Sequence, residues 1–280
     1  MASETGRSAR ALAGEAGARR VNPSDLPAGA DVLVVATPSP SHLELATRGV
    51  RAGATVLVES PWWTDLAQAD TAVEVDRIGP GRLRGAANLR SSPLWRRARS
   101  ERTALGRVRH LSGAIHQPLP DWGHLAAEAA APNPFERLGS TAVPLALDLV
   151  GAVWPVVDSV RAERSGPQGW IELATEGLVV HLDLAFTDPA NVWFQAASDD
   201  GVLRVEFSPA PGLERDGDPV EVGRSADPLA ATGYVDQLAR LGTDEDLTLD
   251  PQQIRTVVAL LDAAQQSADR GGQSIAVGPG

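Results

Sequence analysis

Short, continuous apolar runs alternate with amphipathic stretches along the first third of the sequence. The runs Asp31–Ala36 and Thr55–Glu59 are typical of strands buried on both faces of a parallel sheet, and Arg82–Leu89 predicts a third, weaker strand. Helices are predicted between them, at Ser41–Ala52 and Thr64–Ile78. This alternation of strand and helix indicates a doubly wound α/β sheet.

The rest of the chain has a different pattern, in which short alternating segments are separated by Gly and Asp-Gly turns. Strands are predicted at Arg107–Ile115, Val157–Arg164, Trp170–Ala174, Leu178–Phe186, Val192–Ala197 and Gly201–Phe207. Helices are predicted at Gly139–Val153, Ala230–Leu241 and Asp250–Asp269, the last with Asp250 as its cap. The strand order favours an antiparallel meander. We therefore predict an incomplete Rossmann-like domain over residues 1–92 and an α+β domain with an open, mainly antiparallel sheet over residues 93–280.

Composition narrows the possible functions. The chain has 280 residues and a formal net charge of −11, which argues against a general nucleic-acid or anionic-membrane binder. It contains no cysteine, and all 25 of its basic residues are arginine, so thiolate and lysine chemistry are both excluded. No apolar run approaches the roughly 20 residues of a membrane span, and no signal peptide stands out, so we expect a cytoplasmic protein.

Five segments carry motifs that occur together in one protein family. They are Ala36-Thr37-Pro38 through His42, Gly53 through Glu59-Ser60-Pro61, Asn88-Leu89-Arg90 with Pro93 and Arg96-Arg97, Gly106-Arg107-Val108, and Ala263 through Ile275. The first resembles an ATP-x-x-x-H motif and the second a GKHVLVEKP motif. In order and spacing the five segments resemble the Gfo/Idh/MocA family of NAD(P)-dependent oxidoreductases, over nearly the whole chain.

This resemblance implies a Rossmann domain, a sheet-based second domain, and hydride transfer between a nicotinamide and a sugar-like or polyol substrate. It also implies a bound NAD or NADP. The positions that would contact the cofactor are Ala36, Thr37, Pro38, His42, Glu59 and Pro61. At His42, a capping and packing role at the start of a helix is the competing interpretation.

The sequence departs from the family at the positions that carry its chemistry. No GxGxxG phosphate loop occurs, which argues against ordinary dinucleotide binding. Ser60 stands where the family has the lysine of its EKP motif. Thr141 and Pro144 stand where its LGSH-x-x-D helix has His and Asp, and Asp148, one turn further on, aligns poorly. None of the three replacements is an acid or base at neutral pH. Relative to the family, we expect an N-terminally truncated and catalytically degenerate chain.

A missing first strand would leave a hydrophobic parallel edge beside Asp31–Ala36. Three explanations are open. The true start lies upstream of Met1, the segment Ala18–Val21 pairs directly with Asp31–Ala36, or a partner supplies the missing strands.

Other residues offer replacement chemistry. His116, Asp121 and His124 cluster in a Pro-rich segment, where a His and Asp pair suits acid–base work, and an exposed loop is the competing interpretation. Their spacing is too general to indicate a metal site. Trp62 and Trp63, directly after Pro61, would either stack on a ring-shaped ligand or fill space in the fold.

Three functions follow. The first is a family homologue that has lost hydride transfer and acts as a binding or partner subunit, in a homo-oligomer or with an active paralogue, through the open sheet. The second is an active NAD(P)-dependent oxidoreductase with a substituted proton donor such as His116 or His124. The third is a cofactor-independent lyase or isomerase that uses the same cleft.

Overall fold

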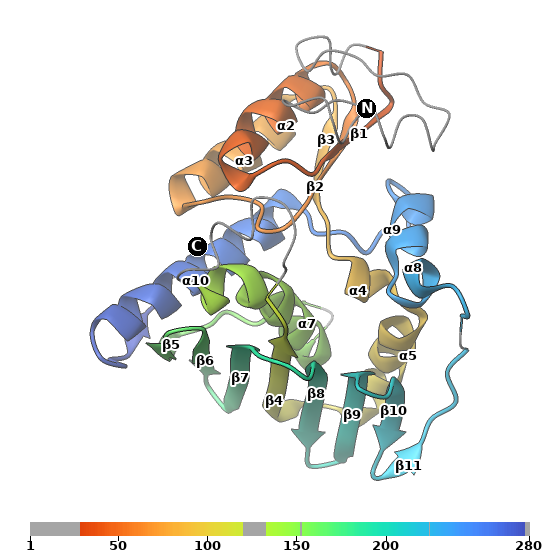
Figure 1. Cartoon of the computed structure of the whole chain (residues 1–280), viewed down its shortest axis with the longest axis vertical. Helices are drawn as coiled ribbons and strands as arrows, with labels where there is room; N and C mark the ends of the chain where they lie inside the picture. The colour runs from red at the N-terminus through yellow and green to blue at the C-terminus, as the bar shows by residue number, and fades with distance from the viewer. Residues whose placement is uncertain (1–28, 120–132, 152, 224, 278–280) are drawn as a thin grey trace. The chain divides into compact units, whose positions relative to one another are not determined.

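A computed structural model describes residues 29–119, 133–151, 153–223 and 225–277. The chain divides into two compact units (Figure 1). Unit 1 comprises Met1–Ala86 and Leu249–Arg255, and unit 2 comprises Ala87–Thr248 and Thr256–Gly280. The sequence pattern placed the boundary at residue 92 and did not anticipate that residues 249–255 belong to the first unit.

Unit 1 is built on a three-stranded parallel sheet, here called sheet A. Its strands are β1 (Val32–Val35), β2 (Thr55–Val58) and β3 (Arg82–Gly85), in the order β1-β2-β3. They are connected by η2 (Ser39–Ser41), α2 (His42–Arg51) and α3 (Leu66–Ile78). These elements confirm the predicted alternation of strand and helix, although β3 is shorter than expected, because residues 88–91 form the short helix α4 (Asn88–Ser91).

The outer edge of sheet A carries exposed apolar side chains. Among the described residues β1 pairs only with β2, and Val32 and Val34 are 50% and 48% exposed. In the central strand β2, by contrast, Val56 and Val58 are fully buried. The prediction of a strand buried on both faces is therefore wrong for β1, although it is right for β2. The segment Ala18–Val21, one candidate for covering this edge, lies outside the described residues.

The returning segment Leu249–Arg255 closes unit 1. Leu249 and Gly85 exchange two backbone hydrogen bonds, of 2.8 and 3.0 Å. Asp250 and Gln253 then form a reciprocal cap, in which the Gln253 N–H donates to Asp250 Oδ1 at 2.7 Å and the Asp250 N–H donates to Gln253 Oε1 at 3.2 Å. This confirms the predicted start of α10 (Pro251–Asp269).

Unit 2 is built on a nine-stranded sheet, here called sheet B, in the order β11-β10-β9-β8-β4-β7-β6-β5-β12. Its strands are β4 (Val108–Gln117), β5 (Ser159–Ser165), β6 (Gln168–Thr175), β7 (Leu178–Phe186), β8 (Asn191–Ser198), β9 (Gly201–Ser208), β10 (Gly212–Arg215), β11 (Asp218–Pro219) and β12 (Ile275–Ala276). The prediction of a simple meander needs one correction. The first strand, β4, lies between β7 and β8 and pairs with β7 in parallel, while all other pairs are antiparallel.

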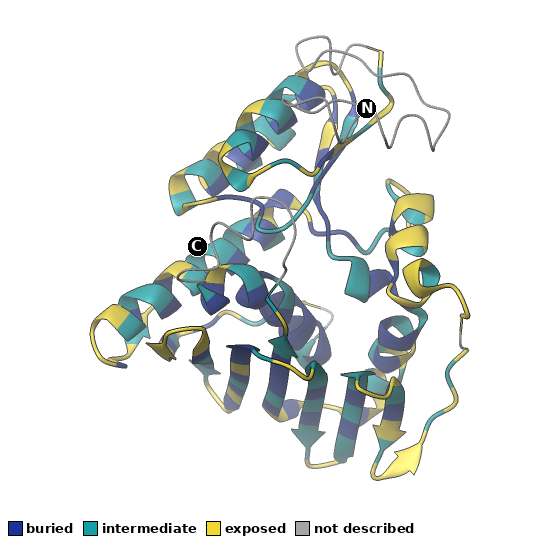
Figure 2. Ribbon diagram, in the orientation of Figure 1, coloured by how far each residue is buried: buried dark blue, intermediate teal, exposed yellow. Residues whose placement is uncertain are grey.

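Helices cover one face of sheet B. These are η4 (Phe135–Gly139), α7 (Ser140–Val150), α5 (Pro93–Arg102) and the later part of α10, and η3 (Thr103–Leu105) leads into β4. Buried and less buried residues alternate along the strands (Figure 2). Trp95 of α5 packs on Phe194 of β8, with ring centroids 5.5 Å apart. The other face carries polar and half-buried aromatic side chains, as expected of an antiparallel sheet covered on one side.

Two further helices differ from the sequence prediction. The single helix expected over Ala230–Leu241 is instead α8 (Pro228–Ala231) followed by α9 (Tyr234–Arg240). Gly233 separates them, because it takes a left-handed conformation with a φ of 86°. Among the described residues no helix is both long and apolar enough to cross a membrane.

Candidate functional site

The residues predicted to contact a cofactor lie at one edge of sheet A. Ala36, Thr37 and Pro38 directly follow β1, and Glu59 and Pro61 directly follow β2. The backbone N–H of Glu59 donates to Val35 O at 2.9 Å, which extends the pairing of the two strands by one step. The carboxyl ends of parallel strands, next to a helix start, are where ligands bind in open α/β sheets. The structure therefore brings these five positions, together with His42, to the expected kind of edge.

His42 joins the two loops of this edge. It is the first residue of α2 and only 1% exposed. Its Nε2 lies 2.5 Å from Thr37 O, in the loop after β1, and its Nδ1 lies 3.2 Å from Trp62 O, in the loop after β2. Burial lowers the pKa of His42, and the nearby carbonyls of Thr37, Trp62 and Pro61 offset this only in part. His42 is thus a positioning residue whose buried ring lies between the two loops, and in its neutral form it donates to one of the two carbonyls.

Glu59 and Ser60 follow β2 at the same edge. Burial raises the pKa of Glu59, and a hydrogen bond to the Ser60 backbone counteracts this. The two tryptophans after Pro61 are in the core, since Trp62 and Trp63 are 2% and 3% exposed. Trp62 donates its Nε1–H to Ala86 O at 3.2 Å. Of the two roles considered for the tryptophan pair, the structure fits the packing role.

The helix that resembles the family's catalytic helix is α7. Thr141 is half-buried near its start, and Pro144 is buried inside it. Neither side chain can transfer a proton at neutral pH. Asp148 is the one carboxylate on this helix, and it is 4% exposed.

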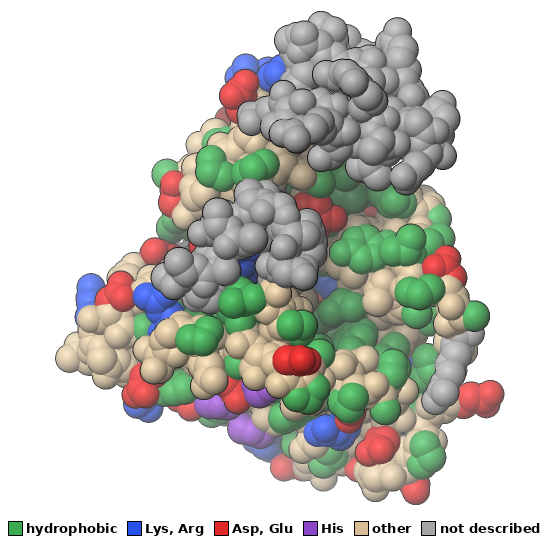
Figure 3. Space-filling view, viewed as in Figure 1, with side chains coloured by type: hydrophobic (Ala, Val, Ile, Leu, Met, Phe, Trp, Pro, Cys, Tyr) green, Lys and Arg blue, Asp and Glu red, His purple; other side chains and the backbone are tan. Residues whose placement is uncertain are grey.

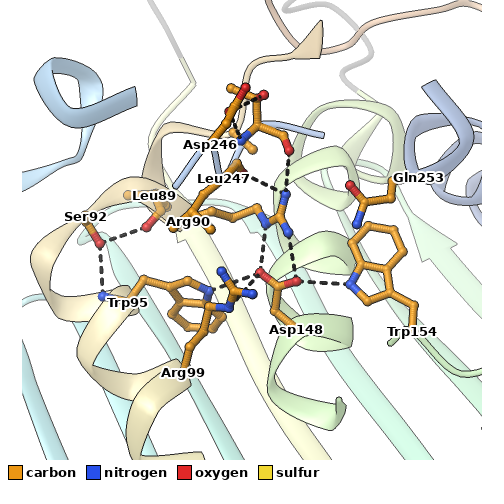
Figure 4. Close-up of polar contacts among 12 residues, drawn as sticks. Leu89, Arg90, Ser92, Trp95, Arg99, Asp148, Trp154, Asp246, Leu247 and Gln253 are labelled. Carbon is orange, nitrogen blue, oxygen red and sulfur yellow. Dashed lines mark hydrogen bonds and ion pairs between the residues drawn. The ribbon is translucent and has the colours of Figure 1, made fainter. Parts of the chain in front are cut away.

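Asp148 belongs to a buried ion pair (Figure 4). Arg90 of α4 donates to both of its oxygens, from Nε at 2.7 Å and from Nη2 at 3.0 Å. Two indoles donate as well, Trp154 at 3.0 Å and Trp95 at 3.4 Å. Arg90 is also anchored by the carbonyl of Leu247, at 2.7 Å. A buried carboxylate that accepts four hydrogen bonds stabilises the fold and is not free to transfer protons.

Of the three predicted replacement residues the structure describes only His116, which does not face α7. His116 lies on β4 with its Nε2 3.3 Å from Asp183 Oδ2, a contact that becomes an ion pair when the histidine is protonated. On β7 the neighbours of Asp183, Leu182 and Leu184, are buried on the helix-covered face, whereas Asp183 is exposed. His116 therefore points to the face of sheet B that α7 does not cover. Asp121 and His124 lie outside the described residues.

The edge of sheet A fits a dinucleotide only in part. It offers a loop pair fixed by His42 and a carboxyl group at Glu59. The glycine-rich loop that would bind the pyrophosphate through backbone N–H groups does not occur in the sequence. In the described part of the chain no group of three or more His, Asp or Glu side chains is arranged to hold a metal ion.

Sequence reasoning overlooked one group, the pair formed by Arg90 and Asp148. The signal that would have found it is the single carboxylate inside the apolar helix sequence of residues 142–149. A charge in such a setting needs a partner of opposite charge.

Comparisons with known proteins agree with this architecture. Residues 2–77 match the family model described as "Oxidoreductase family, NAD-binding Rossmann fold". A search of curated protein sequences found no match.

Several solved structures share the fold of the whole chain. GenD2 from gentamicin A biosynthesis, solved in complex with NAD, is 22% identical with a TM-score of 0.78, covering 98% of this chain and 86% of that one. The WlbA dehydrogenase from Bordetella pertussis, in complex with NADH and UDP-GlcNAcA, is 21% identical with a TM-score of 0.76, covering 100% and 90%. An oxidoreductase from Agrobacterium radiobacter, in complex with NAD+, L-tartaric acid and magnesium, is 17% identical with a TM-score of 0.78, covering 98% and 89%.

The match lies where the structure has β1, α2, β2 and most of α3, the elements of a parallel nucleotide-binding sheet. The similarity to the solved structures extends this over both units. Residues 2–77 therefore match the NAD-binding Rossmann domain of the Gfo/Idh/MocA oxidoreductase family, and the chain as a whole shares the two-unit fold of these solved dehydrogenases.

Proposed function

We propose that this chain is a Gfo/Idh/MocA homologue that retains ligand binding at the edge of sheet A and has lost hydride transfer as an isolated polypeptide. The observation that carries this proposal is which side chains α7 presents. Thr141 and Pro144 stand at the acid–base positions, and the nearby carboxylate of Asp148 is buried against Arg90. With Ser60 after β2 in place of lysine, the chain offers no ordinary proton donor at any of the three matched positions.

The proposed ligand at sheet A is NAD or NADP. This part of the proposal is supported by the family match over residues 2–77 and by the dinucleotides bound to GenD2 and WlbA. When bound, the nicotinamide would supply hydride chemistry. Thr37 and Pro38 would form one wall of the site and Pro61 the other, with His42 holding both loops in place.

The proposed role also requires a partner, which is a second copy or an active paralogue that binds the open face of sheet B. This face carries half-buried aromatic side chains. Trp170 stacks on His181 at 5.8 Å, and Arg204 lies 4.7 Å from the ring centre of Trp193. The lower part of Figure 3 shows histidine, arginine and carboxylate side chains together over these strands. Aromatic and arginine side chains are enriched at protein interfaces.

A second candidate function is an active oxidoreductase, and Glu59 favours it. Its side chain is half-buried at the edge of sheet A beside Ser60, and this partial burial raises its pKa. A carboxyl group with a raised pKa is suited to proton donation.

Titration with NADH and NADPH, followed through tryptophan fluorescence, tests the proposal. We expect micromolar binding that His42→Ala weakens by about tenfold or more, while the exposed control His110→Ala binds as the unchanged protein does. No binding to a folded protein at about millimolar cofactor would refute the cofactor assignment.

Turnover separates the two candidate functions. The proposal expects no oxidation of NADH by the isolated chain with UDP-sugar, inositol or tartrate-type substrates. Turnover that is lost in Glu59→Gln and kept in the exposed control Glu44→Gln would instead establish the active oxidoreductase. Light scattering, which measures the oligomeric state, tests whether the chain binds a partner. A monomer at all concentrations, both alone and mixed with an active family member from the same cell, would refute the subunit role.

A further inference from the structure

Unit 2 contains a pocket of about 380 Å³ whose lining includes none of the candidate site residues discussed so far. It lies where β4 begins and α7 ends. Its walls combine polar and apolar surface in about equal parts, and the apolar part includes Val108 and Leu178, which are buried at the strand ends, and Val156, which is 64% exposed. Its size is within the range of small-molecule sites, which combine apolar walls with a few polar groups.

Two arginines supply the charge of this pocket. Arg102 at the end of α5 donates from Nη2 to Val150 O at 3.0 Å, and Arg107 before β4 donates from Nη2 to Glu176 O at 2.9 Å. Neither has a carboxylate partner within the described residues. Two arginines of sheet B do have carboxylate partners, since Arg109 pairs with Asp199 and Arg204 with Glu206. Arg102 and Arg107 differ from them in that both line the same pocket.

Both guanidinium groups are held in place before any ligand arrives. The two carbonyls fix their Nη2 atoms, and Gly177 allows Arg107 to approach closely, since a Cβ there would lie 3.1 Å from Arg107 Nη2. The Nε of Arg102 is buried without a hydrogen-bond partner. A guanidinium with spare donors, fixed beside apolar walls, is preorganised for a planar anion.

The charge balance of the pocket favours one class of ligand. Its single carboxylate is that of Glu176, which is exposed, so the lining carries two positive charges and one negative charge. The apolar walls add a demand that a free inorganic anion does not meet. From these contacts we infer that the pocket binds a small organic carboxylate with an apolar body, placing its carboxylate between Arg102 and Arg107 and its body against Val108, Val156 and Leu178.

Calorimetric titration of the full chain with hexanoate tests this assignment, with 1-hexanol and inorganic phosphate as comparison ligands. We expect hexanoate to bind with a Kd of about 1 mM or tighter, and the other two at least about tenfold more weakly. Arg107→Gln and Arg102→Gln should each weaken hexanoate binding by about tenfold, because one charge-assisted hydrogen bond is lost in each. Arg164→Gln, at an exposed arginine in β5, is the matched control and should bind hexanoate normally.

The variant Val156→Glu tests the same site without disturbing the fold. Position 156 is exposed, so the substitution should leave thermal unfolding unchanged and still repel the carboxylate. The assignment is overturned if hexanoate does not bind the unchanged protein at about 10 mM, if hexanol binds equally well, or if the Arg164→Gln control loses as much affinity as Arg107→Gln.

Discussion

Replacing Asp148 by Asn removes one charge from the interior of unit 2 with almost no change in volume. Arg90 then keeps its charge, with a side chain that is only 5% exposed and no carboxylate partner at bonding distance. The substitution also turns an amide N–H₂ toward donors. These are the Arg90 guanidinium, at 2.7 and 3.0 Å in the original pair, and the Trp154 indole, at 3.0 Å.

The expected cost follows from these contacts. Breaking a buried pair by removing one partner costs about 3–5 kcal/mol, because the remaining charge is desolvated and uncompensated. For a domain of about 150–250 residues, about 1 kcal/mol corresponds to a shift of roughly 2–4 °C in Tm, so the melting temperature of unit 2 should fall by roughly 6–20 °C. Thermal and urea unfolding, followed by the fluorescence of Trp95 and Trp154, measure this directly. Both indoles contact Asp148, so they monitor unit 2.

Two control variants separate the effect of breaking a buried ion pair from the effect of losing any carboxylate. Asp199→Asn removes the carboxylate of the exposed ion pair with Arg109 and should leave the melting temperature nearly unchanged. The double variant Arg90→Met with Asp148→Leu removes both charges and should recover most of the lost stability, because no buried charge remains. Unfolding of Asp148→Asn within about 1 kcal/mol of the unchanged protein would refute the assignment of Asp148 to structure.

Two further predictions concern unit 1. The pKa of buried His42 is below its ordinary value of 6.5, so the unfolded chain takes up the proton first, and stability should fall as the pH drops below that value. Unfolding measured between pH 8 and pH 5 should show this slope in the unchanged protein, and a slope that persists in His42→Gln would contradict it. Gly85→Ala should destabilise unit 1 by about 1–3 kcal/mol in urea unfolding, because the new Cβ would lie 2.7 Å from Ile254 Cδ1 and 2.9 Å from Trp62 Nε1, whereas Gly53→Asn, in open space at a φ of 88°, should cost less.

Local sequence patterns predicted unit 1 well for a physical reason. A parallel strand buried on both faces has an unbroken apolar sequence, and β2 is such a strand. β1 has the same kind of apolar sequence and forms the predicted strand, but Val32 and Val34 are exposed on it. The pattern failed at β4, whose alternation predicts a strand but not its neighbours. Pairing with β7 in parallel joins residues about 70 positions apart, such as His110 and Val179, and no local signal specifies that choice.

In the candidate site, too, some features follow from the order of strands and helices and others do not. That His42 and the residues after β1 and β2 share one edge follows from the strand and helix order alone. That His116 points away from α7 does not, because it depends on which face of β4 the helices cover. The pairing of Arg90 with Asp148, 58 positions apart, was not predicted by any local pattern either. The single carboxylate in an apolar helix did indicate that Asp148 has a partner, but not which one.

The geometry of α7 strengthens the inference that hydride transfer is lost. Thr141, Pro144 and Asp148 are spaced three, then four, residues apart, so they follow one stripe of the helix. Exposure falls along this stripe, from half-buried Thr141 to Asp148 at 4%. Pro144 between them is also buried. At position 148 the carboxylate meets Arg90 and two indoles. Restoring an acid to α7 therefore requires a change at position 141 or 144, since Asp148 cannot leave Arg90 without the cost derived above.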